Sequence, residues 1–116
     1  EDGWIEGQME VQRLDDIINS SSKISLIKLD IQGGEVKALR GMQELLKSQT
    51  SISVFTEFWP YGIRGAGDTI EEFLSFFEGF QAFCIMEKEK RIVLVTDWNS
   101  LVAPDSDHFV NILFVK

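Results

Sequence analysis

The sequence predicts an α/β fold with a sheet that is parallel in its first part and antiparallel in its last part. Two segments, residues 25–31 and 52–58, are too densely apolar for strands with one face in water, which is typical of buried parallel strands. Each is followed by apolar residues at helical spacing. Two strand-like segments around a charged turn, and then a last strand, complete the pattern. Helices are expected to pack on the sheet.

The first elements are short. Residues 9–12 alternate apolar and polar side chains, which predicts a brief, half-buried strand. Asp15 is then predicted to cap a short helix through residues 16–18, because an aspartate side chain can accept a hydrogen bond from a free N–H of the first helical turn. The apolar strand of residues 25–31 follows.

A glycine pair separates this strand from the next helix. Gly33 and Gly34 indicate a tight turn, and apolar residues then recur at helical spacing through Lys47. Gly41 lies inside this predicted helix at a cost of about 1 kcal/mol relative to alanine. Its presence suggests that the helix backbone approaches the sheet closely, and simple tolerance of the glycine is the alternative.

The second apolar strand ends at Pro60, because proline cannot continue a central ladder of hydrogen bonds. Residues 60–68 are then expected to form a loop. A capping-box pattern in residues 68–72 starts an apolar helical stripe that Gly79 closes.

The last part of the chain predicts antiparallel strands. Residues 82–86 and 91–95 flank the charged turn of residues 87–90, which favours a hairpin. Residues 97–107 are expected to be loop, and residues 110–115 form the closing strand.

Composition limits the classes of function. The chain has 116 residues, 44% hydrophobic and 26% charged, as expected for one soluble globular domain. Its formal charge of −8 would repel phosphate backbones and anionic lipids, so neither nucleic acid nor membrane is an expected partner. One cysteine and one histidine exclude an internal disulfide and a Cys/His zinc site within this sequence. The absence of a signal-peptide pattern or long apolar run predicts a cytoplasmic protein. The chain begins with Glu rather than Met, so we expect an excised or incomplete segment.

Two acids mark the ends of the predicted parallel strands. Asp30 lies near the end of the first and Glu57 near the end of the second. Ligands of open α/β sheets bind beyond the carboxyl ends of parallel strands, so the two carboxylates are expected to share a crevice and to shift each other's pKa. One of them can then act as a base. The alternatives are a turn or helix cap for Asp30, an ion pair with Lys28 or Arg64 for Glu57, and a shared Mg²⁺ site with only two visible protein ligands.

Other candidates surround this pair. Gln32 belongs to the glycine turn, and Glu35 lies in the first turn of the following helix, where the helix dipole alone would favour a carboxylate. Trp59 and Tyr61 flank Pro60 on the second strand end and are suited to hold a sugar or another ring. Burial against the neighbouring helix is the alternative for these aromatic residues.

These motifs resemble a known family. Residues 26–35, LIKLDIQGGE, and residues 36–41, VKALRG, resemble the hKhDhEGxE and hLxG signature of FkbM-type S-adenosylmethionine-dependent methyltransferases, where h is hydrophobic. Residues 11–16 look like the V-x-x-L-D-D segment of the family. Residues 57–64 are similar to an EFWPxGhR version of the second strand end, and residues 111–113 fit the closing strand.

The sequence departs from the family pattern in two ways. Gln32 stands where many members carry glutamate, which puts a catalytic base at that position in doubt. The Gly-rich loop and the acid that bind the cofactor in the family's first strands are absent from this sequence. The resemblance therefore implies that residues 1–116 form a single partial domain, the C-terminal half of a Rossmann-like class I methyltransferase without its cofactor-binding half.

The resemblance also implies a chemistry. The complete enzyme would transfer a methyl group from S-adenosylmethionine to a hydroxyl of a sugar or secondary metabolite, a small-molecule or glycan acceptor, and this chain alone would neither bind the cofactor nor be active. Asp30 is the predicted base and Glu57 the orienting or second acid. The remaining candidates would shape the acceptor pocket: Gln32, Glu35, Trp59 and Tyr61. The alternative is a non-catalytic, methyltransferase-like interaction module.

Without the earlier strands of such a fold, the strand of residues 24–31 becomes a sheet edge, which is prone to aggregation. We therefore expect this edge to be paired or covered. The candidates are another copy of the chain, which would give a homodimer, the strand of residues 9–12, or a further segment.

Overall fold

The computed structural model describes residue 3, residues 6–103 and residues 105–116. Within this part, no helix is long and apolar enough to cross a bilayer. The helices and strands in chain order are α1 (Leu14–Ile17), β1 (Leu26–Leu29), α2 (Glu35–Arg40), α3 (Gln43–Ser48), β2 (Ser53–Phe58), α4 (Pro60–Gly65), α5 (Ile70–Ser75), β3 (Gln81–Met86), β4 (Arg91–Leu94), the 3₁₀ helix η1 (Trp98–Ser100) and β5 (Val110–Val115).

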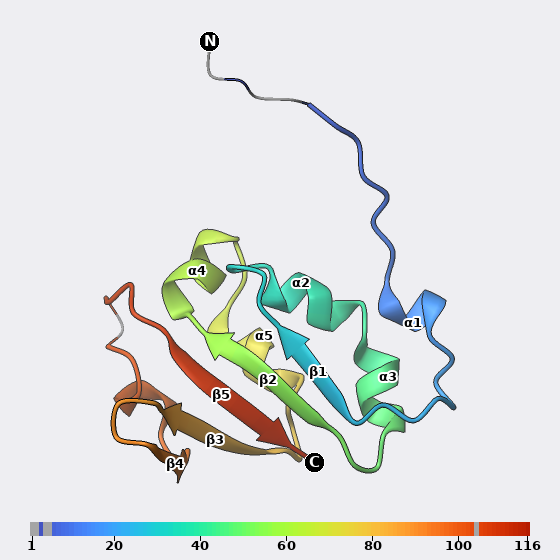
Figure 1. The fold of residues 1–116 in the computed structure, drawn as a ribbon. Helices are drawn as coiled ribbons and strands as arrows, with labels where there is room; N and C mark the ends of the chain where they lie inside the picture. Colours follow the sequence, from blue (N-terminus) through green and yellow to red (C-terminus); the bar gives the residue numbers. More distant parts are fainter. Residues whose placement is uncertain (1–2, 4–5, 104) are drawn as a thin grey trace.

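The five strands form one mixed sheet in the order β1-β2-β5-β3-β4 (Figure 1). β1 and β2 are parallel, whereas β5 is antiparallel to both β2 and β3, and β3 and β4 form an antiparallel hairpin. The predicted parallel start, the hairpin and the closing strand are thus confirmed. The protein is a small α/β structure.

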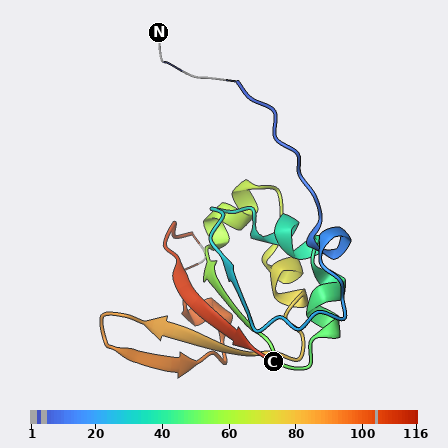
Figure 2. The same cartoon turned by 45° about the vertical axis from the view of Figure 1, so that its right-hand side comes forward.

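One face of the sheet carries the core. Helices α2, α3 and α5 lie on this face, as Figure 2 shows from the side. Val54, Phe58 and Phe114 project from the strands and are almost fully buried. The rings of Phe77 and Phe114 stack with centroids 3.6 Å apart, and Phe73 lies edge-on to Phe114 at 6.1 Å. Burial of these large apolar surfaces is the main stabilising contribution to the fold.

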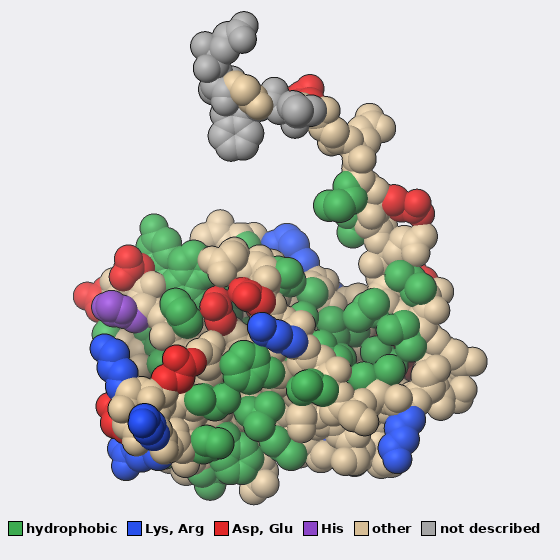
Figure 3. All heavy atoms as spheres, in the orientation of Figure 1, with side chains coloured by type: hydrophobic (Ala, Val, Ile, Leu, Met, Phe, Trp, Pro, Cys, Tyr) green, Lys and Arg blue, Asp and Glu red, His purple; other side chains and the backbone are tan. Residues whose placement is uncertain are grey.

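The opposite face of the sheet is open. Side chains that face this way from neighbouring strands include the register row Phe55, Leu113, Phe83 and Leu94. Apolar side chains gather on this face (Figure 3), and Leu26, Ile92 and Leu94 are 61%, 62% and 48% exposed. An apolar sheet face without a covering layer indicates an interaction surface.

β1 is an edge strand of the sheet, as the sequence predicts for a chain without the earlier strands of the fold. Residues 9–12 do not pair with it: they form no strand and are exposed, so the predicted amino-terminal strand is wrong for this chain. An alternating sequence forms a strand only beside a partner strand, and the described residues place none next to residues 9–12.

The helix predicted through Lys47 is broken in two. α2 ends at Arg40 and α3 starts at Gln43, with Gly41 between them. A Cβ at Gly41 would lie 3.4 Å from the Cα of Arg13, an ordinary contact, and none of its three nearest neighbours belongs to the sheet. The predicted close approach to the sheet is therefore wrong, and the alternative, simple tolerance of the glycine, fits these surroundings.

Asp15 caps a different helix from the one predicted. It lies inside α1, and its carboxylate accepts hydrogen bonds from the backbone N–H groups of Glu44 (3.1 Å) and Leu45 (2.9 Å) in the first turn of α3. An acid at a helix start stabilises that helix whichever segment supplies it.

Two further expectations concern the segment after β2. Residues 60–68 are not all loop, because Pro60 occupies the first turn of α4, where a missing N–H costs nothing. The predicted cap of α5 is confirmed in its first half, since Thr69 Oγ1 accepts a hydrogen bond from the N–H of Glu72 at 3.1 Å. The Glu72 carboxylate bonds Arg40 and does not complete a capping box. Gly79, with φ +86°, ends the turns that follow α5.

Candidate active site

Asp30 and Glu57 lie at neighbouring strand ends. The parallel register pairs Leu29 of β1 with Thr56 of β2, so the residues that follow each of them come next to one another at the same edge of the sheet. The Glu57 side chain lies on the open face, because it alternates with Val54, Thr56 and Phe58, which face the core. The predicted adjacency of the two acids is therefore present in the fold.

The electrostatics of Glu57 reflect this position. Burial raises the pKa of the Glu57 carboxyl above its ordinary value, and the negative charges of Asp30 and then Glu35 raise it further. The ion pairs found between described residues include neither Glu57 nor Lys28, so the proposed pairing of these two is not found there. A partly buried carboxyl with raised pKa and other acids nearby has the properties of a proton acceptor.

The turn after β1 holds Asp30 in place. Gln32 has a left-handed backbone, with φ +53°, and its Nε2 donates a hydrogen bond to Asp30 Oδ1 at 3.3 Å. A glutamate at this position would be unable to donate this bond. Asp30 does not cap α2, because the N-cap position of that helix is occupied by Gly34. The capping alternative for Asp30 is thus not found.

Gly33 joins the two strand ends. It has φ +99°, and a Cβ there would lie 2.8 Å from the carbonyl oxygen of Gly62 in α4. The turn after β1 and the helix after β2 therefore touch through their backbones, which fixes the strand ends that carry the two acids. Sequence reasoning singled out Gly33 but missed Gly62. The only available signal for Gly62 was its place in the WPYG segment.

Trp59 and Tyr61 have different roles in the structure. A Cβ added to Gly62 would overlap the Trp59 ring, so Trp59 lies directly against α4. Its Nε1 donates a hydrogen bond to the carbonyl oxygen of Asp107 at 2.8 Å, which ties the end of β2 to the loop before β5. Tyr61 is 57% exposed, with its ring centroid 5.9 Å from that of Trp59. Tyr61 is thus the aromatic side chain that is free to contact a ligand.

Glu35 is the most buried of the candidate residues. It is the first residue of α2, is 1% exposed, and neither of its carboxylate oxygens has a hydrogen-bond partner among the described residues. Burial of a carboxylate without partners is costly, so such a group requires a reason beyond packing. Its inaccessibility in this conformation does not favour the predicted direct contact with an acceptor.

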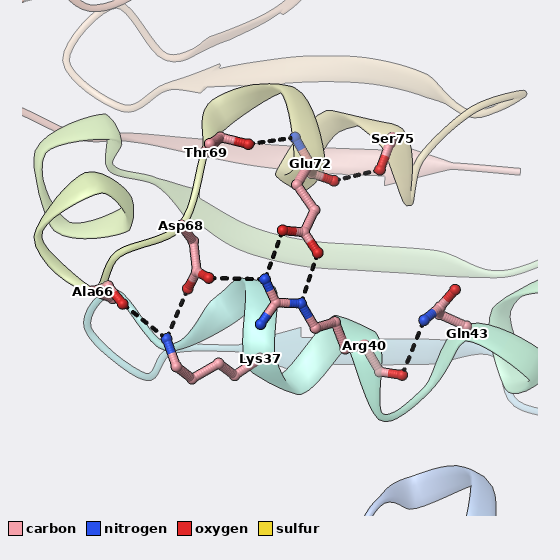
Figure 4. Close-up of polar contacts among 8 residues, drawn as sticks. All are labelled: Lys37, Arg40, Gln43, Ala66, Asp68, Thr69, Glu72 and Ser75. Carbon is pink, nitrogen blue, oxygen red and sulfur yellow. Dashed lines mark hydrogen bonds and ion pairs between the residues drawn. The ribbon is translucent and has the colours of Figure 1, made fainter.

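A second group of charged residues lies between α2 and α5. Asp68 accepts hydrogen bonds from Lys37 Nζ at 2.8 Å and Arg40 Nη2 at 2.9 Å, and Glu72 accepts two from Arg40, each 2.6 Å long (Figure 4). The two cations hold the pKa values of Asp68 and Glu72 below their ordinary range. We call these four residues the α2–α5 ion-pair network. The sequence showed Lys37 and Arg40 on one side of a helix, but gave no signal for their partners.

The turn after β1 is closely packed, since a Cβ at Gly33 would lie 2.8 Å from the carbonyl oxygen of Gly62. A groove of about 510 Å³ lies between α3 and α5, and its lining contains none of the six candidate residues. A search of the described residues for three or more His, Cys, Asp or Glu side chains that could hold a metal ion found no such group.

Comparison with known proteins gives one match. The family model described as Methyltransferase FkbM domain matches residues 6–84. No curated protein and no solved structure matches the chain. The matched range runs from the segment before α1 into β3 and includes all six candidate residues.

Proposed function

Because the chain belongs to the FkbM methyltransferase domain family, we propose that it forms the acceptor side of an O-methyltransferase. In this proposal the mixed sheet is the C-terminal half of a Rossmann-like fold, with the acceptor at the ends of β1 and β2. The observation that carries the proposal is the pair of acids at these adjacent ends, one of which has a raised pKa. The acceptor would be a hydroxyl of a sugar or secondary metabolite.

The chain's own part in the reaction is to orient the acceptor and to remove a proton. A base is most effective when its pKa lies near the working pH, and the Glu57 carboxyl is moved in that direction. Asp30 is more exposed and is held by Gln32. These features favour Glu57 as the proton acceptor and Asp30 as the acid that orients the hydroxyl. The two roles are thus the reverse of those predicted from the sequence.

The aromatic residues that follow β2 supply a surface for the acceptor. Tyr61 is exposed in the first turn of α4, the helix that follows β2, and can stack on a ring, whereas Trp59 donates a hydrogen bond to Asp107 and lies against α4. Glu35 and Gln32 would then support the acid pair without contacting the acceptor, because Glu35 is buried and Gln32 bonds Asp30. An acceptor with a planar or sugar ring and a free hydroxyl satisfies this arrangement.

S-adenosylmethionine would supply the methyl group in the complete enzyme. Because the Gly-rich loop of the family pattern does not occur in this sequence, we propose that other polypeptide regions bind the cofactor. Calorimetric titration of S-adenosylmethionine into this chain should therefore show little or no binding. The product of the whole open reading frame should bind it if a Gly-rich loop precedes these residues.

The test of function is transfer of a labelled methyl group by that product to a panel of sugars and polyols. Glu57→Gln and Asp30→Asn should each lower turnover by roughly 10²-fold or more while cofactor affinity stays unchanged. Glu71→Gln, which changes an exposed acid on α5, is the matched control. Near-normal turnover in both site variants would refute the proposed role of the acids.

A second candidate is a non-catalytic interaction module. The open apolar face of the sheet favours it, because such a surface suits a protein partner. The two candidates differ in the labelled-methyl assay: a module would show no transfer even when the cofactor is bound.

A further inference from the structure

The end of the sheet that carries Asp30 and Glu57 also includes parts of β5 and β3. β3 is antiparallel to β5, and β5 is antiparallel to β2, so β3 runs in the same direction as β2. The arrows of β1, β2 and β3 accordingly point the same way in Figure 1. The end of β3 and the start of β5 therefore lie where β1 and β2 end. Side chains from four neighbouring strands can contribute to the candidate site.

Asn111 is the polar side chain next to Glu57 on β5. The antiparallel register places Asn111 directly opposite Glu57. Its neighbour Ile112 is fully buried in the core, so the Asn111 amide lies on the open face of the sheet, as Glu57 does. The other side chains that β5 presents on this face, Leu113 and Val115, are apolar. Asparagine is uncommon in strands, so a polar side chain at this position requires a reason.

Glu87 holds the amide of Asn111. Glu87 directly follows β3, and its Oε1 accepts a hydrogen bond from Asn111 Nδ2 at 3.2 Å. Glu87 is exposed and Asn111 is half-buried, so a ligand can reach both. The Asn111 Oδ1 atom and the Glu87 carboxylate are hydrogen-bond acceptors. A ligand group that binds to them must therefore be a donor.

The charges at this end of the sheet limit the chemistry of that donor. Asp30, Glu57 and Glu87 are acids, so a carboxylate or phosphate on the ligand would be repelled. A neutral hydroxyl can donate a hydrogen bond without this repulsion. Neighbouring strands lie about 4.8 Å apart, so a ring that places one hydroxyl at Glu57 can place another at Asn111.

We propose that Asn111 and Glu87 bind a second hydroxyl of the acceptor, beside the hydroxyl that Glu57 deprotonates. The two residues then determine specificity, because they select a neutral acceptor with two hydroxyls over one with a single hydroxyl. This inference rests on the proposed methyl transfer at the acid pair. Both residues lie outside residues 6–84, so the family match does not assign them a role.

Methyl transfer to sugars that lack single hydroxyls tests the inference. The probes are the methyl glycosides of glucose, galactose and mannose with their monodeoxy analogues, and the enzyme is the product of the whole open reading frame. Loss of the second hydroxyl should lower kcat/KM by about 10- to 100-fold, as expected for a hydrogen bond to a charged group. In Asn111→Leu, the glycoside and this analogue should be used equally well.

Two glutamates of one turn provide a matched pair of variants. Glu87→Ala removes an exposed side chain and should reduce the selectivity for the second hydroxyl as Asn111→Leu does. Glu89→Ala, two residues further along the same turn, should leave the selectivity unchanged. Thermal melts check that each variant folds. Unchanged selectivity in both Asn111→Leu and Glu87→Ala would overturn the inference.

Binding and transfer together separate this inference from the proposed function. Calorimetric titration of the same glycosides requires no methyl transfer, and loss of the second hydroxyl should weaken binding to the unmodified protein but not to Asn111→Leu. Binding with this selectivity but without transfer would refute the proposed function alone. Transfer with equal kcat/KM for the glycosides and all their reactive analogues would overturn the second hydroxyl site alone. Absence of both binding and transfer would overturn both.

Discussion

Two groups of acids, one between α2 and α5 and one at the ends of β1 and β2, differ in whether cations accompany them. In the α2–α5 ion-pair network, Asp68 and Glu72 are bonded by Lys37 and Arg40, and the pKa of each acid is lowered. At the strand ends, Glu57 is in none of the ion pairs found between described residues, and its pKa is raised. The first arrangement stabilises the fold, whereas the second leaves a carboxyl able to exchange a proton. Pairing therefore separates structural acids from candidate functional ones.

The largest expected effect on stability comes from disturbing the backbone contact that supports the ends of β1 and β2, where Asp30 and Glu57 lie. Gly33→Ala places a Cβ 2.8 Å from the Gly62 carbonyl oxygen at a backbone with φ +99°. We expect a loss of about 1–3 kcal/mol in the free energy of unfolding, measured by urea denaturation. Gly65→Ala, where no atom lies within 4 Å of the added Cβ, is the control. Equal stability of the two variants would contradict the packing of the strand ends.

The paired acids should matter for stability. Asp68→Asn removes the charge that faces both Lys37 and Arg40, so we expect the melting temperature at neutral pH to fall by about 5 °C. Asp30→Asn, the matched change at the strand ends, should alter it little. Equal changes in melting temperature for the two substitutions would contradict the difference between the two regions.

The pH dependence of stability should separate the regions further. A carboxyl whose folded-state pKa is lowered stabilises the protein above its ordinary pKa, and this stability is lost as the pH falls through the folded-state value. For Asp68 and Glu72 the loss begins near their ordinary values of 3.8 and 4.5 and continues below them. Thermal melts of the unmodified chain should therefore decline more steeply in acid than those of Arg40→Gln.

The smallest expected effect is a gain in stability rather than a loss. Because the pKa of Glu57 is raised, its ionised form disfavours the fold above the ordinary value of 4.5, and stability returns as the pH falls through the folded-state pKa. Glu57→Gln should accordingly raise the melting temperature at neutral pH by about 1 °C. A clear fall in the melting temperature would indicate a bonded, structural carboxylate instead.

Local patterns in the sequence predicted most of the fold. The two parallel strands, the hairpin and the Thr69 cap of α5 depend on neighbouring residues, and all of them are confirmed. The burial predicted for the first strand is wrong, because β1 lies at the edge of the sheet and Leu26 is 61% exposed. The errors arose where a distant segment decides the outcome. Asp15 caps α3 because the fold brings α1 there, and residues 9–12 form no strand because no partner lies beside them.

The candidate site also contains features that local sequence patterns predict and features that depend on the tertiary arrangement. The positions of Asp30 and Glu57 could be predicted from the ends of two parallel strands, since the carboxyl ends of such strands share one edge. The contact of Gly33 with Gly62 and the engagement of Trp59 by Asp107 depend on the tertiary arrangement. No spacing in the sequence encodes these contacts.

The most direct test is to measure the pKa of Glu57 by carboxyl-carbon NMR in the unmodified chain and in Asp30→Asn. If the two acids share one site, the unmodified chain should show a value above the ordinary one, and removal of the Asp30 charge should lower it. An ordinary value in the unmodified chain, or the same value in both proteins, would contradict a shared site at the strand ends.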